Sequence, residues 1–352
     1  MNRRDLGIGI GASLGAALLN ASLAKVAKAA GPGRWMTAKP IPVGANEVIG
    51  AAVGGKLLVY GGLSSFVAQG LFWAYDPATD SWTELAGRPD NTHHSACVGV
   101  GDRFYVFGGF RKPADGQAVW QPTHAAWVFD LPSKTWTQLP PMPTARGALT
   151  ACQAGDRIYV IGGSDIPPWD KTHAGMTLQW GGEQSAANEV FDIKTGKWST
   201  ANPMLQGRNH MKSTLVNGKI YVIGGRVGSA FVGASTSVGI NEAYDVAKDS
   251  WTPMAMMPTP RGGLEVAMLD NKIHVLGGEA YAFGLQGTSN VHEVYDPAVN
   301  SWNIAPNMPS RRHGFAIAEI GGKIYCVTGS DVAGNGGGPA TGITANEVFI
   351  PE

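Results

Sequence analysis

The sequence predicts an all-β fold, a six-bladed β-propeller with four antiparallel strands in each blade. Three observations support this. An apolar segment ending in a glycine pair recurs six times, an aromatic residue and a tryptophan follow it at fixed spacing, and only one interval of the repeat varies in length. A composition with 49 glycines, 11 tryptophans and 15% charged residues fits many tight turns and aromatic packing.

Each apolar segment has the pattern of a strand buried between neighbouring sheets. The segments end at Gly62, Gly109, Gly163, Gly225, Gly278 and, in a degenerate copy, Gly329. In the five complete repeats the aromatic residue precedes the tryptophan by seven positions, and each tryptophan precedes the next glycine-pair position by 26. All insertions therefore fall between the glycine pair and the aromatic residue.

This pattern resembles the Kelch repeat, and it covers nearly all of the chain after the first 30 residues. The resemblance implies that the glycine pair ends the second strand of each blade, that the aromatic residue lies on the third and the tryptophan on the fourth. The variable segments then become long loops between the second and third strands. Those loops and the entrances to the first strands would share one face of the ring.

The ends of the repeat region predict how the ring closes. The sixth repeat has its aromatic residue, Phe349, but the sequence stops at Glu352, before the expected tryptophan. Trp35 lies 26 residues before Gly61, the spacing found in every other repeat. We therefore expect the strand around Trp35 to complete the last blade, which would leave no open sheet edge.

Residues 1–29 resemble a twin-arginine export signal. Arg3 and Arg4 precede a mildly apolar stretch, and Ala27 and Ala29 have the spacing of a signal peptidase site. We expect a periplasmic or secreted protein whose residues 30–352 form one propeller domain, with a retained anchor or a Sec signal as alternatives. A formal net charge of zero argues against nucleic-acid binding. We further expect a monomer that does not contact the membrane after cleavage.

Three cysteines, Cys97, Cys152 and Cys326, make an odd count, so at least one thiol is unpaired. None belongs to a metal-binding motif, and all fall on expected strands, where buried thiols are unreactive.

The predicted ligand site lies at the mouth of the central channel. Sixteen residues before the glycine pair, four repeats carry an arginine: Arg146, Arg208, Arg261 and Arg312. These side chains could bind carboxylates with paired hydrogen bonds, or they could brace neighbouring loops or blades. The glutamates Glu189, Glu242, Glu293 and Glu347, which precede the aromatic residues, are expected to form a repeated structural hydrogen bond or ion pair.

Histidines and one glutamate follow the arginine register. Glu47, His94 and His210 share one register and could hold a metal ion, although each also suits a hydrogen-bonded structural role. We take His93, His94 and Glu47 as candidates for acid–base catalysis and assign no metal and no cofactor. His210 and His313 are expected to contact the ligand, with Trp169 and Trp180 of the third blade's long loop, unless these tryptophans fold that loop down instead.

Two functions remain open. The first is an exported binding protein that recognises an anionic small molecule, a glycan or a protein partner on the loop face. The second is an enzyme, because the sequence also resembles sialic acid mutarotases, which are exported six-bladed Kelch propellers that act on a carboxylated sugar. A metal oxidase resembling galactose oxidase fits poorly, because that propeller has seven blades and a tyrosine–cysteine crosslink.

Overall fold

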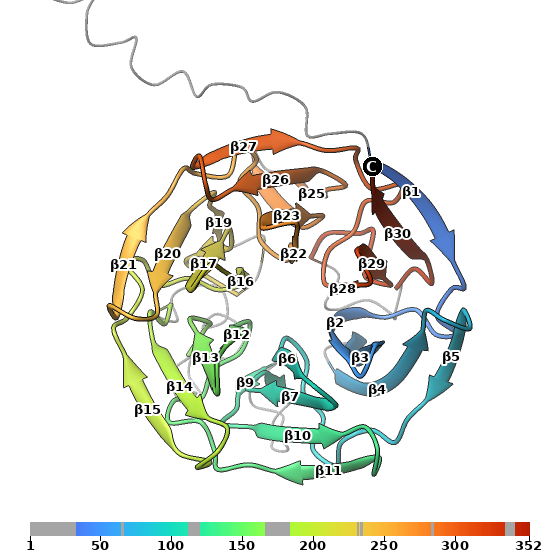
Figure 1. Cartoon of the computed structure of the whole chain (residues 1–352), viewed down its shortest axis with the longest axis horizontal. Coiled ribbons are helices and arrows are strands. Elements are labelled where there is room, and N and C mark those ends of the chain that lie inside the picture. Colours follow the sequence, from blue (N-terminus) through green and yellow to red (C-terminus); the bar gives the residue numbers. More distant parts are fainter. Residues whose placement is uncertain are drawn as a thin grey trace, which may run out of the picture.

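A computed structural model shows a closed ring of blades with the first strands innermost (Figure 1), and these strands line a central channel. It describes residues 33–64, 67–111, 120–165, 184–230, 232, 235–282, 285–334 and 342–352. Within these residues, six four-stranded antiparallel sheets form the blades, so the predicted fold is confirmed. The predicted export signal lies outside the described residues, as do Trp169 and Trp180.

The blades share one topology, in which the first strand faces the channel and the fourth forms the rim (Figure 1). Blade 1 contains β2 (Asn46–Val53), β3 (Lys56–Ser64), β4 (Val67–Asp76) and β5 (Ser81–Glu84). Blade 2 contains β6 (Ala96–Val100), β7 (Arg103–Phe107), β10 (Ala126–Asp130) and β11 (Thr135–Gln138). Blade 3 contains β12 (Thr150–Ala154), β13 (Arg157–Ile161), β14 (Asn188–Asp192) and β15 (Trp198–Ala201).

The second half of the ring repeats this order. Blade 4 contains β16 (Lys212–Val216), β17 (Lys219–Ile223), β20 (Asn241–Asp245) and β21 (Ser250–Pro253). Blade 5 contains β22 (Glu265–Leu269), β23 (Lys272–Leu276), β26 (His292–Asp296) and β27 (Ser301–Ile304). Blade 6 contains β28 (Ala316–Ile320), β29 (Lys323–Val327), β30 (Asn346–Pro351) and β1 (Gly33–Ala38).

Short two-stranded sheets extend the loops between the second and third strands of three blades. They pair β8 (Phe110–Arg111) with β9 (Gln121–Pro122), β18 (Arg226–Val227) with β19 (Thr236–Ser237), and β24 (Glu279–Ala282) with β25 (Leu285–Thr288). Isolated bridges such as His93 to Phe110 and His313 to Ser330 join these loops to the entrances of the first strands. Both kinds of loop therefore lie on one face of the ring, which we call the loop face.

The apolar core is divided among the interfaces between blades. Between blades 1 and 2, for example, Tyr60 and Phe72 pack against Phe104 and Phe129. The second and third strands contribute most of these side chains, and both faces of those strands are covered, which explains their continuous apolar runs. Burial of such surface stabilises the fold by about 25 cal/mol for each Å².

The repeated tryptophans link each blade to the one before it. Each indole Nε1 donates a hydrogen bond of 2.8–3.0 Å to a backbone carbonyl of the preceding blade or its connection. Trp82, for example, donates to Lys39, and Trp302 donates to Ala255. The six indoles make the same contact at equivalent positions, which accounts for the fixed spacing of tryptophan in the sequence.

Ring closure follows the prediction from Trp35. Strand β1 pairs antiparallel with β30, and Trp35 lies opposite Phe349 with their ring centroids 5.4 Å apart. In Figure 1 the blue β1 lies beside the red β30, so the two ends of the propeller share blade 6. No helix in the described part of the chain is long and apolar enough to cross a membrane.

Candidate functional site

One residue from each blade forms a narrow ring at the loop-face mouth of the channel. These residues immediately precede or begin the first strands, and all have a positive φ of 52–62°. We call them the mouth ring: Glu47, His94, Ala148, His210, Gly263 and Gly314. Hydrogen bonds such as His210 N to Ala148 O (2.9 Å) and Gly263 N to His210 O (3.0 Å) connect successive members.

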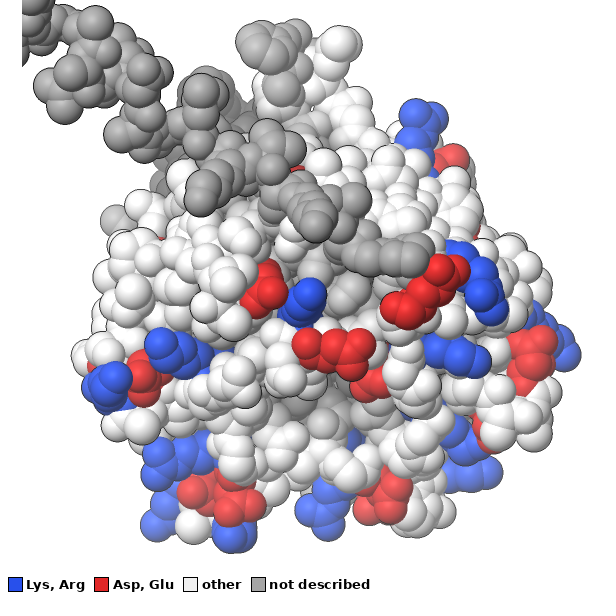
Figure 2. All heavy atoms as spheres, turned by 45° about the horizontal axis from the view of Figure 1, so that its top comes forward, with Lys and Arg blue, Asp and Glu red and all other residues white. Residues whose placement is uncertain are grey.

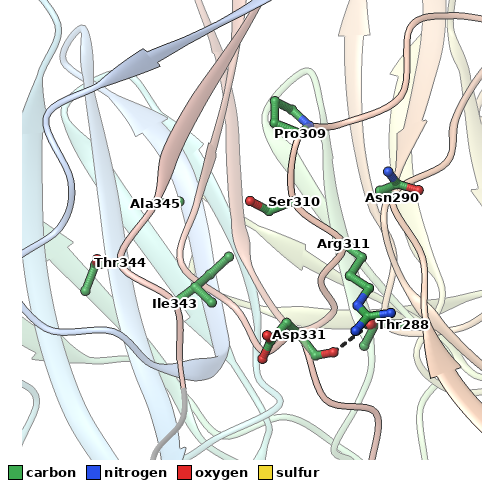
Figure 3. A pocket seen from close by; sticks show the side chains of 9 residues that line it. All are labelled: Thr288, Asn290, Pro309, Ser310, Arg311, Asp331, Ile343, Thr344 and Ala345. Atoms are coloured by element: carbon green, nitrogen blue, oxygen red, sulfur yellow. Dashed lines mark hydrogen bonds between the residues drawn. The ribbon is translucent and has the colours of Figure 1, made fainter.

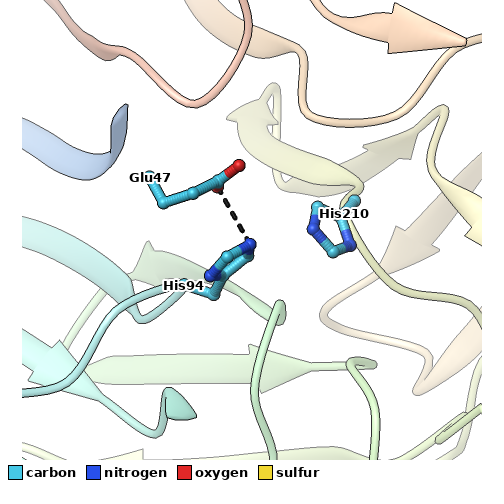
Figure 4. Close-up of side chains that lie close together, drawn as sticks. All are labelled: Glu47, His94 and His210. Atoms are coloured by element: carbon cyan, nitrogen blue, oxygen red, sulfur yellow. Dashed lines mark ion pairs between the residues drawn. The ribbon is translucent and has the colours of Figure 1, made fainter. Parts of the chain in front are cut away.

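Glycine adopts this left-handed conformation without a steric penalty, whereas other residues do so at a cost of about 1–2 kcal/mol. Two mouth-ring positions hold glycine, and a Cβ at Gly314 would lie 2.9 Å from the carboxyl carbon of Glu47. The ring therefore leaves space for the side chains of its three larger members, which point toward one another (Figure 4).

Glu47 is the centre of this cluster. Its Oε2 lies 3.1 Å from Nε2 of His94, and its Oε1 lies 3.2 Å from Nε2 of His313. Burial would raise the pKa of Glu47, but His94 and His313 outweigh that effect and hold the pKa well below its usual range. The Glu47 side chain is 11% exposed, so a carboxylate remains in contact with the channel.

The two mouth-ring histidines are largely buried and neutral near pH 7. Burial lowers the pKa of His94 to about 4, and burial together with the charge of Arg226 lowers the pKa of His210 well below its ordinary value. Their ring centroids lie 5.0 Å apart. Neutral imidazole has a lone pair, so these side chains can accept a hydrogen bond or ligate a metal ion.

A second group of charged residues lies behind the mouth ring. Nε2 of His313 lies 3.7 Å from Oε2 of Glu279, and Glu279 forms an ion pair with Arg226. Burial would lower the pKa of His313, but Glu279 and Glu47 outweigh it and raise that pKa. All three residues are at most 2% exposed, so this group supports the mouth ring and does not face solvent.

Neighbouring side chains hold the mouth-ring histidines in place. Nδ1 of His210 lies 2.5 Å from Oδ1 of Asn209, and Nδ1 of His94 lies 2.5 Å from Nδ1 of His93. His93 is 1% exposed and packs against Phe110 and Trp120. The structure thus places His93 behind His94 and brings His94, Glu47, His210 and His313 together.

Below the mouth ring, the channel holds a chamber of about 470 Å³ lined by all six first strands. Lys212 and Glu265 form an ion pair of 2.7 Å in its wall. Burial raises the pKa of Glu265 to about 7, although Lys212 acts in the opposite direction. Cys97 also lines the chamber, and burial raises its pKa to about 12, so this thiol is unreactive near neutral pH.

The four predicted arginines lie inside the blades. All are at most 1% exposed, and each contacts a third-strand glutamate of its own blade. Arg208, for example, donates to Glu242 (2.8 Å) and to the carbonyls of Gly224 (2.9 Å) and Val222 (3.0 Å). These contacts favour the bracing role over ligand binding, with the brace inside a blade, and the glutamates form the predicted ion pair.

Trp120 belongs to a small apolar cluster under the loop of blade 2. It is 4% exposed, and its ring stacks on Phe110 with centroids 5.5 Å apart. His94 also lies close to this indole, with centroids 4.9 Å apart. The cluster forms an apolar wall behind the two adjacent histidines of blade 2.

A second, wider pocket of about 800 Å³ lies between blades 5 and 6 (Figure 3). Arg311 and Asp331 line it, and Thr288 donates a hydrogen bond of 2.7 Å to the backbone carbonyl of Asp331. The face drawn in Figure 2 carries acidic and basic residues interspersed along the rim, without a large patch of one sign. Some charged residues form close pairs, such as Lys194 with Asp156 at 2.6 Å.

Sequence reasoning missed four charged residues near the mouth. Arg226 and Glu279 directly follow glycine pairs, where other repeats carry Leu63, Phe110, Ser164 and Ser330. Lys212 and Glu265 are charged residues in first strands, most of which face the channel with small or apolar side chains. Aligning the repeats at those two registers would have singled them out.

Comparisons with known proteins agree with this architecture. A family model for the KLHDC2/KLHL20/DRC7 Kelch-repeats domain matches residues 32–163, and one for the Kelch motif matches residues 207–258 and 260–309. Kelch-like protein terF of Aspergillus terreus is 27% identical over 316 residues, which cover 86% of this chain and 66% of that protein. Human Kelch-like protein 23 is 28% identical over 285 residues, covering 80% of this chain and 45% of that protein.

The chain thus spans less than two thirds of the length of both relatives. Among solved structures, that of YjhT aligns with a TM-score of 0.72 and 16% sequence identity, covering 87% of this chain and 95% of that one. At this identity the likeness shows the fold alone.

Proposed function

Because the chain belongs to the Kelch-repeat family of β-propellers, we propose that it is a binding protein that holds a small carboxylated ligand at the loop-face mouth of its channel. One observation carries the proposal. The side chains of Glu47, His94 and His210 converge in the mouth ring, although the ring conformation favours glycine there. Residues kept in an unfavourable conformation around an opening are typical of binding sites.

The surroundings suit a polar ligand. Lys212 supplies an N–H donor below the mouth, His313 holds Glu47 from behind, and the chamber of about 470 Å³ is large enough for a sugar-sized molecule. Trp120 and Phe110 provide an apolar wall behind the histidines. The four buried arginines play no part in this proposal, because their hydrogen bonds are made inside the blades.

The test is thermal unfolding of the full chain with sugar acids and with the matching neutral sugars. A ligand at 100 times its dissociation constant adds about 2.7 kcal/mol of stability. We expect stabilisation by a sugar acid, and its loss in His210→Asn and His313→Gln. Arg311→Ala is the matched control, since Arg311 lines the rival pocket of Figure 3. If Arg311→Ala is the only variant that loses binding, the ligand binds in that pocket and not at the mouth ring.

A second candidate, an enzyme acting on a carboxylated sugar, is favoured by Glu265. A buried carboxyl group with a pKa near 7, in a chamber next to the mouth, is suited to proton transfer at neutral pH. The test is the rate of anomer interconversion of a bound sugar acid, followed by NMR. We expect Glu265→Gln to lower that rate by about 100-fold or more while the ligand still binds. Equal rates with and without the protein would exclude this activity.

A further inference from the structure

We propose that the mouth ring is a metal site in which Glu47, His94 and His210 bind one divalent transition-metal ion of the zinc or iron(II) class. This inference rests on the proposed ligand site and deepens it, since a metal ion with open coordination positions would bind the ligand's carboxylate. Two histidines and one carboxylate are a common ligand set for catalytic zinc and for non-haem iron.

The distances between the ligand atoms fit this assignment. One ligand atom from each of Glu47, His94 and His210 lies within 4.8 Å of the others. Around an ion bound at about 2.0–2.2 Å, neighbouring ligand atoms lie about 3.0–3.5 Å apart. Glu47 Oε2 and His94 Nε2 lie 3.1 Å apart, and the ligand atom of His210 lies within 4.8 Å of both side chains' ligand atoms.

Outer contacts already orient all three ligands. Oδ1 of Asn209 can only accept, so it fixes the proton on Nδ1 of His210 and leaves Nε2 with a free lone pair. Asn209 is itself held by its Nδ2 group, which donates to Ser229 O (3.1 Å) and to Gln184. Nδ1 of His94 lies 2.5 Å from Nδ1 of His93, so the lone pair of His94 is on Nε2 when His93 accepts this hydrogen bond. Such contacts are typical of histidines that bind metal ions.

The contacts of Glu47 divide its two oxygen atoms between separate roles. His313 lies at Oε1, and Oε2 faces His94. Gly314 has no side chain, and a Cβ there would lie 3.0 Å from Oε1 of Glu47. His313 and Gly314 enclose Oε1, which leaves Oε2, on the side of His94, to ligate a metal ion.

A second set of possible ligands, Glu47, Glu279 and His313, is less suitable. Glu279 has both oxygens engaged, one by Arg226 and the other by the backbone N–H of Gly334 at 2.7 Å. Nε2 of His313 lies between two carboxylates, which is the position of an N–H donor. Either set would give up a histidine–carboxylate contact on binding an ion, but the second would also give up the contacts of Glu279 with Arg226 and Gly334.

The first experiment uses the full chain after removal of metal ions with EDTA. Calorimetric titration with Zn²⁺ should show one bound ion, and Co²⁺ should give visible absorption with histidine coordination. Mg²⁺ should not compete, because it favours oxygen ligands. We expect His94→Ala and His210→Ala to weaken Zn²⁺ binding by at least about 100-fold, and Asn209→Ala by about 10- to 100-fold. His124→Ala, at an exposed histidine of the same face, should leave it unchanged.

The second experiment uses only the unaltered chain, so its result does not depend on whether a variant folds. Anomalous diffraction from crystals of the unaltered chain with Zn²⁺ should place the ion within about 2.2 Å of the three ligand atoms. An ion on Glu279 and His313, no ion at the mouth, or unchanged affinity in both histidine variants would overturn the proposal. If the chain binds a sugar acid but not Zn²⁺, the metal site is refuted and the proposed function stands. If it binds Zn²⁺ but no sugar acid, only the proposed function is refuted.

Discussion

At the scale of single residues, the repeat uses similar side chains for two different purposes. Arginine and the third-strand glutamate form a buried ion pair inside a blade, as Arg208 and Glu242 do. Histidine and glutamate two residues further along enter the mouth ring, as His210 and Glu47 do. The difference is exposure to the channel, because Arg208 is fully buried whereas the Glu47 side chain is 11% exposed.

The buried ion pair gives a prediction on stability. Arg208→Ala should lower the free energy of unfolding by about 3–5 kcal/mol, because it leaves the Glu242 carboxylate buried without a partner. Urea unfolding measures this change. Arg311→Ala, at an exposed arginine, should change stability by less than about 0.5 kcal/mol. If Arg208→Ala unfolded like the unaltered chain but lost its ligand, the arginines would be ligand contacts after all.

At the scale of elements, the closing strand β1 packs over an unusual pair of buried histidines. Nδ1 of His274 on β23 lies 2.8 Å from Nε2 of His292 on β26, and Trp35 and Phe349 contact the ring of His292. Burial lowers the pKa of His274 to about 4 and that of His292 to about 3. Lys272 and Arg261, the nearby cations, act in the same direction.

This pair should make blade closure sensitive to acid. The unfolded histidines titrate near pH 6.5, whereas the folded ones stay neutral until about pH 4, so the folded state binds fewer protons. Stability should therefore fall as the pH drops from about 6.5 to about 4, by at most about 3 kcal/mol for each histidine. Urea unfolding at pH 7, 6 and 5 measures this effect.

The matched comparison is a chain with His274→Gln and His292→Gln, which cannot titrate in this range. Its stability should depend less on pH than that of the unaltered chain, while the other buried histidines contribute equally to both. If the free energy of unfolding falls equally with pH in the two proteins, the histidine pair plays no part in the acid response.

Elements and their order could be predicted from the sequence, whereas the site could be predicted only in part. The spacing of Trp35 from Gly61 is a local count, and β1 pairs with β30 as that count requires. The role of Arg208 depends on whether its guanidinium turns into the blade or toward the channel, which spacing does not encode. Lys212 and Glu265 were missed although they share one register on neighbouring blades, because only the register of the arginines and the two after it were aligned.

At the scale of the whole molecule, we propose that the chain is exported through its twin arginines. Replacing both Arg3 and Arg4 by lysine should leave unprocessed protein in the cytoplasm, because the export machinery reads the arginine pair. Cell fractionation and immunoblotting measure the distribution. The unaltered chain in the same host is the control, and normal export of the double variant would indicate a Sec signal or no signal of this kind.

Closure of the ring gives the last prediction. Removing residues 33–38 takes away β1, the six backbone pairings with β30 and the hydrogen bond from Trp35 to Pro306 O. Blade 6 would then end in an open edge at β30, next to the buried histidine pair. We expect the whole propeller to lose stability in one cooperative transition, by several kcal/mol, because each blade packs against both neighbours.

Differential scanning calorimetry and size-exclusion chromatography of the shortened chain measure this effect. Trp35→Phe is the matched control, since it keeps the strand and the aromatic packing but removes the hydrogen bond, which is worth about 1 kcal/mol. The deletion should also favour dimers, in which exposed β30 edges pair between chains. A monomer that melts at the same temperature as the unaltered chain would show that β1 is not needed to close the ring.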